Sequence, residues 1–345
     1  MKLQKIVNRL QKLHPKEIDL SLDRIKILCK KLGNPQDKIK AISVVGTNGK
    51  QSTINAIFSI LKEAKIRCNI YTSPHIQKIN ERFIFNNNEL TDGELANLFE
   101  EIEEINNNHS ITFFEILSAC YFYKAAQYPN NINLIEAGLF HRFDATNILK
   151  NNLASIVTSI SKDHLDWLPE NEQTIEKIVY EKTSSLLSSN IIVSKQNSIS
   201  TTKCIKKTIS KNTSNKFFFN EDFSYSVGEN GFFYYEDKFG GLKLPFPNIL
   251  GQFQLENIST AIATLRLINI DINDSHVKKG IAKIKTIARL QEIKSGKLKK
   301  LVQNNRLLLD GSHNEDGSRV LNEYLQSLDC KKHVIIGMMS NKDHK

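Results

Sequence analysis

The sequence lacks a long apolar run, and this absence excludes one class of protein. No stretch of about 18 apolar residues occurs in the 345-residue chain, so no segment predicts a helix that crosses a membrane. Residues 1–20 are basic with a helical pattern, and they lack the apolar core and cleavage site of a signal peptide. We therefore expect a cytoplasmic protein with no membrane partner.

Cysteine is scarce and scattered. The five cysteines form no CxxC pair and show no spacing typical of a metal site, which excludes a disulfide framework and a cysteine-based metal centre. They are expected to be small core residues in a reducing compartment. The chain also has no internal repeat and no long low-complexity linker.

A continuous basic tract is missing despite a net charge of +10. The lysines occur as dispersed pairs, and no aromatic-interleaved motif of a nucleic-acid binder accompanies them. This pattern favours a basic surface that attracts anionic small molecules. We expect no nucleic-acid partner, and we expect a monomer.

The most informative stretch is residues 41–61, AISVVGTNGKQSTINAIFSIL. An apolar strand pattern ends at Gly46, and apolar residues at helical spacing resume after Lys50 and Ser52. A strand, a glycine loop with a lysine and a helix N-terminus together form a cradle for phosphates. Gln51 departs from the spacing G-x-x-x-x-G-K-[ST], so a plain Gly/Asn turn is the alternative. The pattern favours an ATP site.

Apolar strands alternate with amphipathic helices along the chain. Strands are expected at 66–72, 83–85, 132–135, 153–160 and 191–193, and helices at 91–106, 113–127 and 175–186 and around 255–265. This alternation predicts an α/β fold with a P-loop-type, doubly wound, mainly parallel sheet. The aromatic and glycine-rich residues 216–247 predict a small antiparallel β section, and residues 194–215 an exposed connection or a weak helix.

The length allows two domains. We expect an ATP-binding domain over residues 1–292 and the start of a smaller Rossmann-like α/β domain over 293–345, with strands at about 306–309 and 333–338. Doubly wound sheets usually hold about five or six strands. The second domain is therefore expected to be incomplete.

Polar residues follow several of the predicted strands. They include Ser73, Glu136 and His164, and in the C-terminal unit Asp310 and His313. Ligands of open parallel sheets bind beyond the carboxyl ends of the strands, where these residues converge. Glu136 follows a buried-type strand, so its carboxylate needs a partner. That partner is Mg²⁺ held together with nucleotide phosphates, or alternatively Arg142 in a salt bridge.

Two further features have more than one interpretation. Lys182 lies on the apolar stripe of its helix, so its side chain either reaches solvent along the protein surface or is buried beside a phosphate or a carboxylate, or with a covalently altered charge. Thr112, Phe113, Phe114 and Glu115 stand at a helix start. They form either a capped, packed terminus or a surface for a flat aromatic ligand.

Ten motifs in order resemble the bacterial folylpolyglutamate synthase/dihydrofolate synthase family of the Mur-ligase superfamily. They are GTNGKQS (46–52), YTSPH (71–75), NERF (80–83), TFFE (112–115), EAGLFHRFDATN (136–147), SKDHLDWL (161–168), EK (181–182), ARLQ (288–291), DGSHNEDG (310–317) and GMMSNKD (337–343).

This resemblance implies an ATP-dependent amide ligase. A pterin-linked carboxylate, in dihydropteroate or a reduced folate, is phosphorylated by ATP, and L-glutamate displaces the phosphate. The resemblance places the functional residues as follows: catalytic Lys50, Lys182 and His313; nucleotide contacts Asn48, Gly49, Lys50, Gln51, Ser52, Asn257, Arg289 and Asp310; pterin contacts Thr112, Phe113, Phe114, Glu115 and Asp144; and magnesium ligands Ser73, Glu136, His164 and a carbamylated Lys182.

The chain also departs from the family pattern. Gln51 replaces a glycine after the lysine, Phe140 and His141 replace two glycines of G-L-G-G-R-L-D, and Thr183-Ser184 replace Ala-Gly after the lysine of EKAG. The alternatives are a Mur-type peptide ligase of cell-wall synthesis and a decayed, non-catalytic nucleotide-binding protein. Whether a ligase of this kind makes dihydrofolate, extends folate tails or does both is left open.

Overall fold

The computed structural model describes residues 2–229 and 231–339. Its α-helices are α1 (Lys2–Leu10), α2 (Asp23–Lys31), α3 (Lys50–Glu63), α4 (Asp92–Asn106), α5 (Phe113–Ala125), α6 (Ile175–Thr183), α7 (Ile199–Thr208), α8 (Phe253–Leu267), α9 (Asp274–Ala282), α10 (Lys297–Leu301) and α11 (Glu315–Gln326). Its strands are β1 (Lys40–Val45), β2 (Cys68–Tyr71), β3 (Phe83–Phe85), β4 (Asn88–Glu89), β5 (Ile132–Glu136), β6 (Asn152–Val157), β7 (Asn190–Val193), β8 (Asn215–Phe218), β9 (Phe223–Val227), β10 (Phe232–Asp237), β11 (Leu242–Pro245), β12 (Gln291–Glu292) and β13 (Leu308–Leu309).

An eight-stranded sheet runs through the protein in the order β4-β3-β2-β5-β1-β6-β7-β8. The strands from β2 to β8 in this order are parallel, and β3 and β4 continue the sheet antiparallel. β1 is central, with Val44 opposite Glu136 and Val45 opposite Val157. The ends of β1, β5 and β6 therefore meet at one edge, and the predicted doubly wound, mainly parallel sheet is confirmed.

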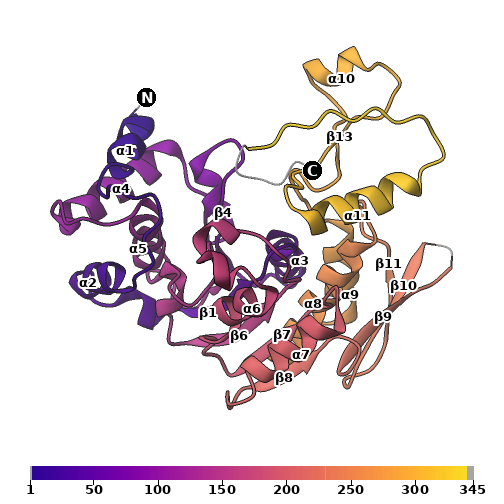
Figure 1. The fold of residues 1–345 in the computed structure, drawn as a ribbon, viewed down its shortest axis with the longest axis horizontal. Helices are drawn as coiled ribbons and strands as arrows, with labels where there is room; N and C mark the ends of the chain where they lie inside the picture. The colour runs from indigo at the N-terminus through magenta and orange to yellow at the C-terminus, as the bar shows by residue number, and fades with distance from the viewer. Residues whose placement is uncertain (1, 230, 340–345) are drawn as a thin grey trace.

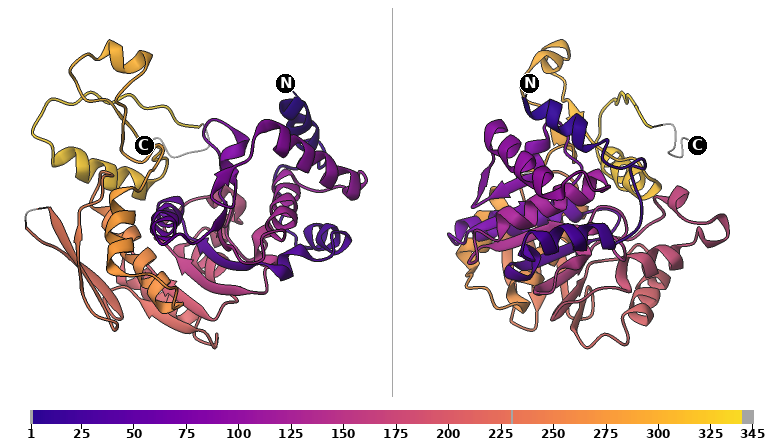
Figure 2. Two further views of the ribbon diagram at one scale, coloured as in Figure 1. Left: turned by 180° about the vertical axis from the view of Figure 1, so that it is seen from behind. Right: turned by 90° about the vertical axis from the view of Figure 1, so that its left-hand side faces the viewer.

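Helices cover the sheet in separate groups (Figures 1 and 2). Helices α1, α2, α4 and α5 form one apolar core at the β2–β3 end, α3, α8 and α9 form a second, and α6 and α7 a third. Local signals set several helix ends: Thr91 and Glu94 form the predicted capping box at the start of α4. Side-chain caps also mark the starts of α5, α6, α7, α9 and α11, whereas α2, α3, α8 and α10 begin without one.

The middle of the chain confirms one expectation and corrects another. Strands β9, β10 and β11 form the predicted antiparallel sheet, with Phe233 and Tyr235 buried and Tyr234 exposed between them. Residues 215–218, expected to belong to these hairpins, instead form β8 and extend the large sheet parallel to β7. The reason is α7: a helix forms within 194–215, so the chain makes a crossover, which a parallel strand requires.

The C-terminal segment differs from the expectation in its second strand. β13 pairs antiparallel with β12, and α11 follows it. The strand predicted at 333–338 is wrong: these residues carry no strand, and Val334, Ile335 and Ile336 are 60%, 99% and 76% exposed. An apolar run forms a strand only where a neighbour accepts its backbone hydrogen bonds. Residues 340–343 of the GMMSNKD motif lie outside the described residues, and the domain boundary at 292/293 stays a prediction.

The absences in the sequence have counterparts in the structure. Among the described residues, no helix is long and apolar enough to cross a membrane. Cys29, Cys68 and Cys120 are buried as expected, and Cys204 is half-buried. Cys330 is exposed, so the expectation of a core position is wrong for that residue, because the C-terminal segment around it is exposed throughout.

Gly280 of α9 lies against the backbone of α3, and Gly93 of α4 provides a control for its substitution. A Cβ on Gly280 of α9 would lie 2.7 Å from the Cα of Ile60 and 2.9 Å from its backbone N, whereas a Cβ on Gly93 of α4 would meet nothing within 4 Å. We expect Gly280→Ala to lower the free energy of unfolding by about 1–3 kcal/mol, because backbone has to move. Gly93→Ala is the control and is expected to leave that free energy unchanged or raise it by up to ~1 kcal/mol. Urea unfolding followed by circular dichroism measures both, and equal stability of the two variants would contradict the prediction.

Candidate active site

The loop between β1 and α3, residues 46–50, is shaped by two glycines. Gly46 has φ +146° and a Cβ there would lie 2.0 Å from Thr158 Oγ1; Gly49 has φ +89° and a Cβ there would lie 2.5 Å from Asn257 Oδ1. Side chains at either position would be strained and would collide. Gly49 is also the N-cap of α3 and has no side chain to accept from the first-turn N–H groups. Those N–H groups are left for an anion. We call residues 46–50 the phosphate loop.

A cavity of about 530 Å³ opens beside the phosphate loop. The predicted site residues that line it are Asn48, Gly49, Lys50, Gln51, Ser52, Ser73, Thr112, Phe113, Phe114, Glu115, Glu136, Asp144, His164, Asn257, Arg289, Asp310 and His313. Lys182 is not among the lining residues. One cavity therefore brings together residues that the sequence separates by more than 250 positions.

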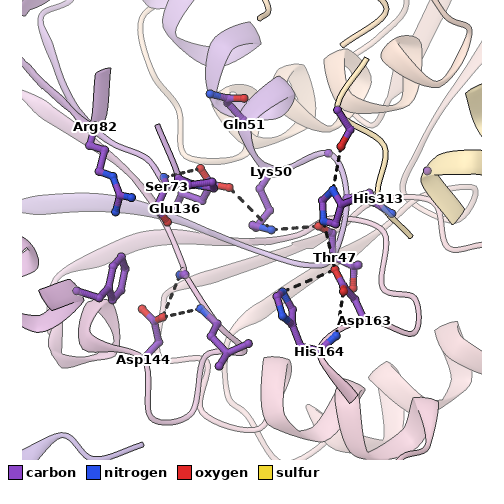
Figure 3. Close-up of a pocket in the computed structure, with 18 of the residues that line it drawn as sticks. Thr47, Lys50, Gln51, Ser73, Arg82, Glu136, Asp144, Asp163, His164 and His313 are labelled. Carbon is purple, nitrogen blue, oxygen red and sulfur yellow. Dashed lines mark hydrogen bonds and ion pairs between the residues drawn. The ribbon is translucent and has the colours of Figure 1, made fainter. Parts of the chain in front are cut away.

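Lys50 and Glu136 face each other at the strand ends (Figure 3). The Lys50 Nζ lies 3.8 Å from Glu136 Oε1 and donates to the carbonyl oxygens of Gly46 (3.3 Å) and Thr47 (3.1 Å). The backbone N–H of Ser73 donates to Glu136 Oε2 at 3.2 Å. Glu136 is only 4% exposed, and burial raises the pKa of its carboxyl while Lys50 acts against that rise.

The alternative salt bridge between Glu136 and Arg142 is wrong. Arg142 instead donates from Nε and Nη2 to the two carboxylate oxygens of Glu181, both at 2.8 Å. Two unit charges about 4 Å apart attract by about 4 kcal/mol at an effective dielectric constant of ~20, which is comparable to the several kcal/mol that desolvation of each ion costs. Lys50 alone therefore does not fully compensate the buried Glu136 carboxylate, which retains capacity for a further cation.

Lys182 is buried, so the interpretation that it reaches solvent is wrong. Its side chain is held beneath the phosphate loop, where Nζ donates to the carbonyl oxygen of Gly46 at 2.9 Å and lies 5.5 Å from the centre of the Phe140 ring. Burial, followed by repulsion from Lys50, lowers the pKa of Lys182 to about 7. A large fraction of this amine is therefore neutral near neutral pH.

Phe140 and His141, which replace two family glycines, lie behind the loop and do not line the cavity, whereas Gln51, which replaces another, does line it. Phe140 has φ +54°, a conformation that favours glycine, and its ring is buried in the core with α6. The His141 Nδ1 lies 3.0 Å from Ser185 Oγ, and burial, with Lys182 nearby, lowers the pKa of His141 to about 4. Both replacements pack against the helix that carries Lys182.

The aromatic end of the cavity is organised by hydrogen bonds within the protein. Thr112 and Glu115 form a capping box at the start of α5, so the interpretation as a capped terminus holds for these two side chains. Phe113 and Phe114 line the cavity, and the Phe114 ring stacks on Tyr71 with the centroids 5.9 Å apart. The Oδ2 of Asp144 accepts from the N–H groups of Gly138 (2.9 Å) and Leu139 (3.1 Å). The terminus is therefore capped, and the interpretation of its rings as a surface for a flat aromatic ligand stays a prediction.

Arg24 is a structural residue of the site that the sequence reasoning missed. It donates to Glu115 Oε2 at 2.9 Å, to Asp19 Oδ2 at 2.7 Å and to the Asp19 carbonyl at 2.6 Å. These bonds hold residues 17–21 against the aromatic end, where they line the cavity. The second oxygen of Glu115, Oε1, is buried and has no hydrogen-bond partner among the residues that the structure describes. A buried acceptor of this kind suits a ligand that carries N–H donors.

Asp163 connects the two histidines of the site (Figure 3). Its Oδ2 lies 3.7 Å from the Nε2 of both His164 and His313, and it accepts from Asn314 Nδ2 at 3.3 Å. His164 is therefore directed toward Asp163 and lines the same cavity as Glu136. Asp163 precedes a predicted ligand, but no local pattern indicates that it contacts the C-terminal segment.

The remaining predicted nucleotide contacts come from two further segments. Asp310 Oδ2 accepts from the N–H of Leu290 at 2.7 Å, and the Arg289 Nη1 donates to the carbonyl of Ala288 at 2.9 Å. The Asn257 Nδ2 donates to Gln254 Oε1 at 3.2 Å. These side chains line the cavity, as does Asn48, whose amide also donates to Asn314 at 3.1 Å. Arg82 lines the cavity too; its motif NERF contributes to the family resemblance, but no role is predicted for this residue.

The atoms that the predicted metal ligands offer fit a hard divalent cation beside Glu136. Within the described residues, no group of three or more His, Cys, Asp or Glu side chains could hold a metal ion. The predicted ligands include only two such residues, so the remaining donors have to be Ser73, a modified Lys182, phosphate oxygens or water. Mg²⁺ commonly takes one or two carboxylates and completes its shell with phosphates and water. The residues present fit that mode.

Comparisons with known proteins identify a consistent group of relatives. No family model matches the chain. It is 30% identical over 350 residues to the dihydrofolate synthase/folylpolyglutamate synthase of Haemophilus influenzae, covering 97% of this chain and 77% of that protein. It is 30% identical to the protein of the same name from Escherichia coli, covering 97% of this chain and 75% of that protein.

Solved structures agree with this result. E. coli FolC in complex with DHPP and ADP matches with a TM-score of 0.84 at 29% identity, covering 96% of this chain and 75% of that chain. The Yersinia pestis bifunctional folylpolyglutamate synthase/dihydrofolate synthase, complexed with AMPPNP and Mn ion, matches with a TM-score of 0.82 at 26% identity, covering 94% and 74%.

A matched pair of glycines tests the phosphate loop. Gly49 and Gly231 both have positive φ, +89° and +79°, but a Cβ on Gly231 meets nothing within 4 Å. We expect both alanine variants to lose about 1–2 kcal/mol of stability from the backbone conformation. Only Gly49→Ala is expected to weaken ADP binding, by more than about tenfold or ~1.4 kcal/mol, because its methyl group displaces Asn257 and enters the cradle. Calorimetric titration measures binding, and wild-type affinity in Gly49→Ala would contradict the assignment of the loop.

Proposed function

The chain belongs to the dihydrofolate synthase/folylpolyglutamate synthase family, and we propose that it is an ATP-dependent ligase that joins L-glutamate to a pterin-linked carboxylate through an acyl phosphate. One observation carries the proposal: a single cavity is lined both by the phosphate loop and by the rings of Phe113 and Phe114. A nucleotide and a flat aromatic substrate can therefore meet inside it. A monomeric state and the lack of nucleic-acid binding stay predictions.

The phosphate end supports the first chemical step. A carboxylate is a poor electrophile because it has no leaving group, and transfer of the terminal phosphoryl group of ATP supplies one. Charge on the transferred group has to be stabilised. We assign this role to Lys50 and to the first-turn N–H groups of α3 at Gln51 and Ser52. Asn257, Arg289 and Asp310 complete the proposed nucleotide contacts, and Asn48 supports the loop.

A divalent cation would lie at the end of β5. We propose Ser73, Glu136, His164 and, when carbamylated, Lys182 as the residues that hold Mg²⁺. Bound there, the ion would neutralise charge on the phosphates and orient them. The support from this chain is the buried Glu136 carboxylate, which among the described residues has Lys50 at 3.8 Å as its one ion pair within 4 Å and accepts from the Ser73 N–H.

The aromatic end would hold the pterin-linked substrate. We propose that Phe113 and Phe114 contact its rings and that Thr112, Glu115 and Asp144 surround them. The unpartnered Oε1 of Glu115 supports this placement, because a pterin presents N–H donors. His313 reaches the phosphate end from the C-terminal segment, and we propose that it acts there on the reacting groups. The α-amine of glutamate then attacks the acyl carbon and phosphate leaves.

The proposal predicts ADP formation that requires both co-substrates. We expect the purified chain to release ADP only with L-glutamate and either dihydropteroate or a reduced folate, and not with UDP-sugar peptides. The pterin substrate that is used decides between dihydrofolate synthase, folylpolyglutamate synthase and both activities.

Lys50→Ala is expected to lower the rate at least ~100-fold, because about 3 kcal/mol of charge stabilisation is lost. The control Lys62→Ala changes an exposed lysine at the other end of α3 and is expected to keep the rate. A wild-type rate in Lys50→Ala would refute the assignment.

Carbamylation of Lys182 predicts a dependence on carbon dioxide and pH. The neutral amine attacks CO₂, forming a carbamate and releasing one proton. Because the pKa of Lys182 is lowered to about 7, we expect uptake of labelled CO₂, read by NMR, to rise as the pH increases through 7. Lys182→Arg keeps a cation but cannot form the carbamate, so it is expected to lose labelling and activity together. Acetate or formate is expected to restore part of the activity of Lys182→Ala. Full activity without a labelled carbamate signal would contradict this assignment.

A further inference from the structure

The N-terminal turn of α11 is joined to the phosphate loop by a reciprocal pair of amides. The Asn48 Nδ2 donates to Asn314 Oδ1 at 3.1 Å, and the Asn314 Nδ2 donates to Asn48 Oδ1 at 3.2 Å. Asn314 is also the N-cap of α11, where it accepts from the N–H of Gly317 at 2.9 Å. The side chain of Asn48 is therefore oriented by a residue that lies 266 positions away.

Asp316 adds a charged acceptor to this contact. Its Oδ2 accepts from Ser159 Oγ at 3.1 Å and from Asn48 Nδ2 at 3.4 Å, and its Oδ1 accepts from Arg319 Nη2 at 2.8 Å. The side chain is buried, and its hydrogen bonds and Arg319 keep the pKa of the carboxyl below its usual value despite that burial. One carboxylate thus bridges the loop after β1 and the loop after β6.

The same two loops are also joined through their backbones. The N–H groups of Thr47 and Asn48 donate to the carbonyl of Ser159 at 2.8 and 3.2 Å. Ser159 therefore holds the phosphate loop from the backbone side, and Asp316 holds Ser159 and Asn48 from the side-chain side. We call Asn48, Ser159, Asn314 and Asp316 the Asp316 cluster.

We propose that Asp316 is a positioning residue for nucleotide binding, which acts through Asn48 and Ser159 and keeps the phosphate loop in its binding conformation. The loop contains two glycines and so has more backbone freedom than other loops of its length. If the loop becomes ordered only when the nucleotide binds, the lost conformational entropy lowers the affinity. A loop that is already ordered in the free protein does not lose that entropy on binding. The inference rests on the proposed function only in taking residues 46–50 as the nucleotide loop.

The test compares ADP binding in variants of the full chain. Asp316→Ala is expected to bind ADP about tenfold more weakly than the wild type and to bind the pterin substrate with unchanged affinity. Glu323→Gln is the matched control: Glu323 is on the same helix and pairs with the same Arg319, but it is 61% exposed and its ion pair is with Arg319 rather than with a residue of the cluster. It is expected to bind both ligands as the wild type does. Asp316→Asn keeps the volume of the side chain and provides a folded variant if alanine is not tolerated, with an expected loss of about threefold.

A double-mutant cycle decides whether Asp316 acts through Asn48. Asn48→Ala combined with Asp316→Ala is expected to bind ADP no more weakly than the weaker single variant. Three outcomes would each overturn the proposal. The first is a loss of ADP affinity in the double variant that equals the product of the two single losses. The others are equal losses of ADP and pterin affinity, and wild-type ADP binding in both Asp316 variants. Because ADP binding is measured without glutamate, a failure of the proposed ligase reaction is distinguishable from a failure of this inference.

Discussion

Two lysines share the carbonyl oxygen of Gly46, and the rest of the site depends on this arrangement. Lys50 reaches it from the start of α3 at 3.3 Å and Lys182 from α6 at 2.9 Å. Gly46 itself can occupy this position because it has no side chain; a Cβ would lie 2.0 Å from Thr158 Oγ1. Two amines placed so close together repel in their charged forms, which contributes to the lowered pKa of Lys182. The end of β1 is thus a region that attracts anions, with only Glu136 within 4 Å of Lys50 as a compensating carboxylate among the described residues.

The sequence predicts the parts of this site whose position follows from local pattern and sheet topology. The strand, glycine loop and helix predicted for residues 41–61 are found in that order in the structure, because each is specified by neighbouring residues. Glu136 and Ser73 could be placed beside Lys50 because parallel strands deliver their carboxyl ends to one edge. Helical periodicity places Lys182 on the apolar stripe but leaves both a solvent-reaching and a buried side chain open, and the structure shows it buried. Its contact with Gly46 does not follow from that periodicity, since nothing local indicates which loop lies over the helix.

Contacts between distant side chains account for what the sequence did not predict. The partner of Arg142 is Glu181 rather than Glu136. Both carboxylates are buried, so the three-dimensional path of the chain decides which of them Arg142 meets. Asp316 and Arg24 lie in segments that read as an ordinary helix start and an ordinary helix. Residues 333–338 show the opposite error: their strand propensity is real, but propensity forms no strand without a neighbour to accept its hydrogen bonds.

The two ends of the cavity differ in how firmly they are held, and this difference has a physical basis. Glu136 and Asp144 are joined by a short loop whose N–H groups at Gly138 and Leu139 are bound by Asp144 itself, so the spacing between the phosphate end and the aromatic end is fixed within one rigid unit. The C-terminal segment, in contrast, meets the phosphate loop through the amides of Asn48 and Asn314 and the carboxylate of Asp316, and its His313 meets Asp163. Polar contacts of this kind each contribute only a modest net stability, because water can replace either partner. The position of the C-terminal segment beside the nucleotide side of the cavity therefore depends on a few polar side chains.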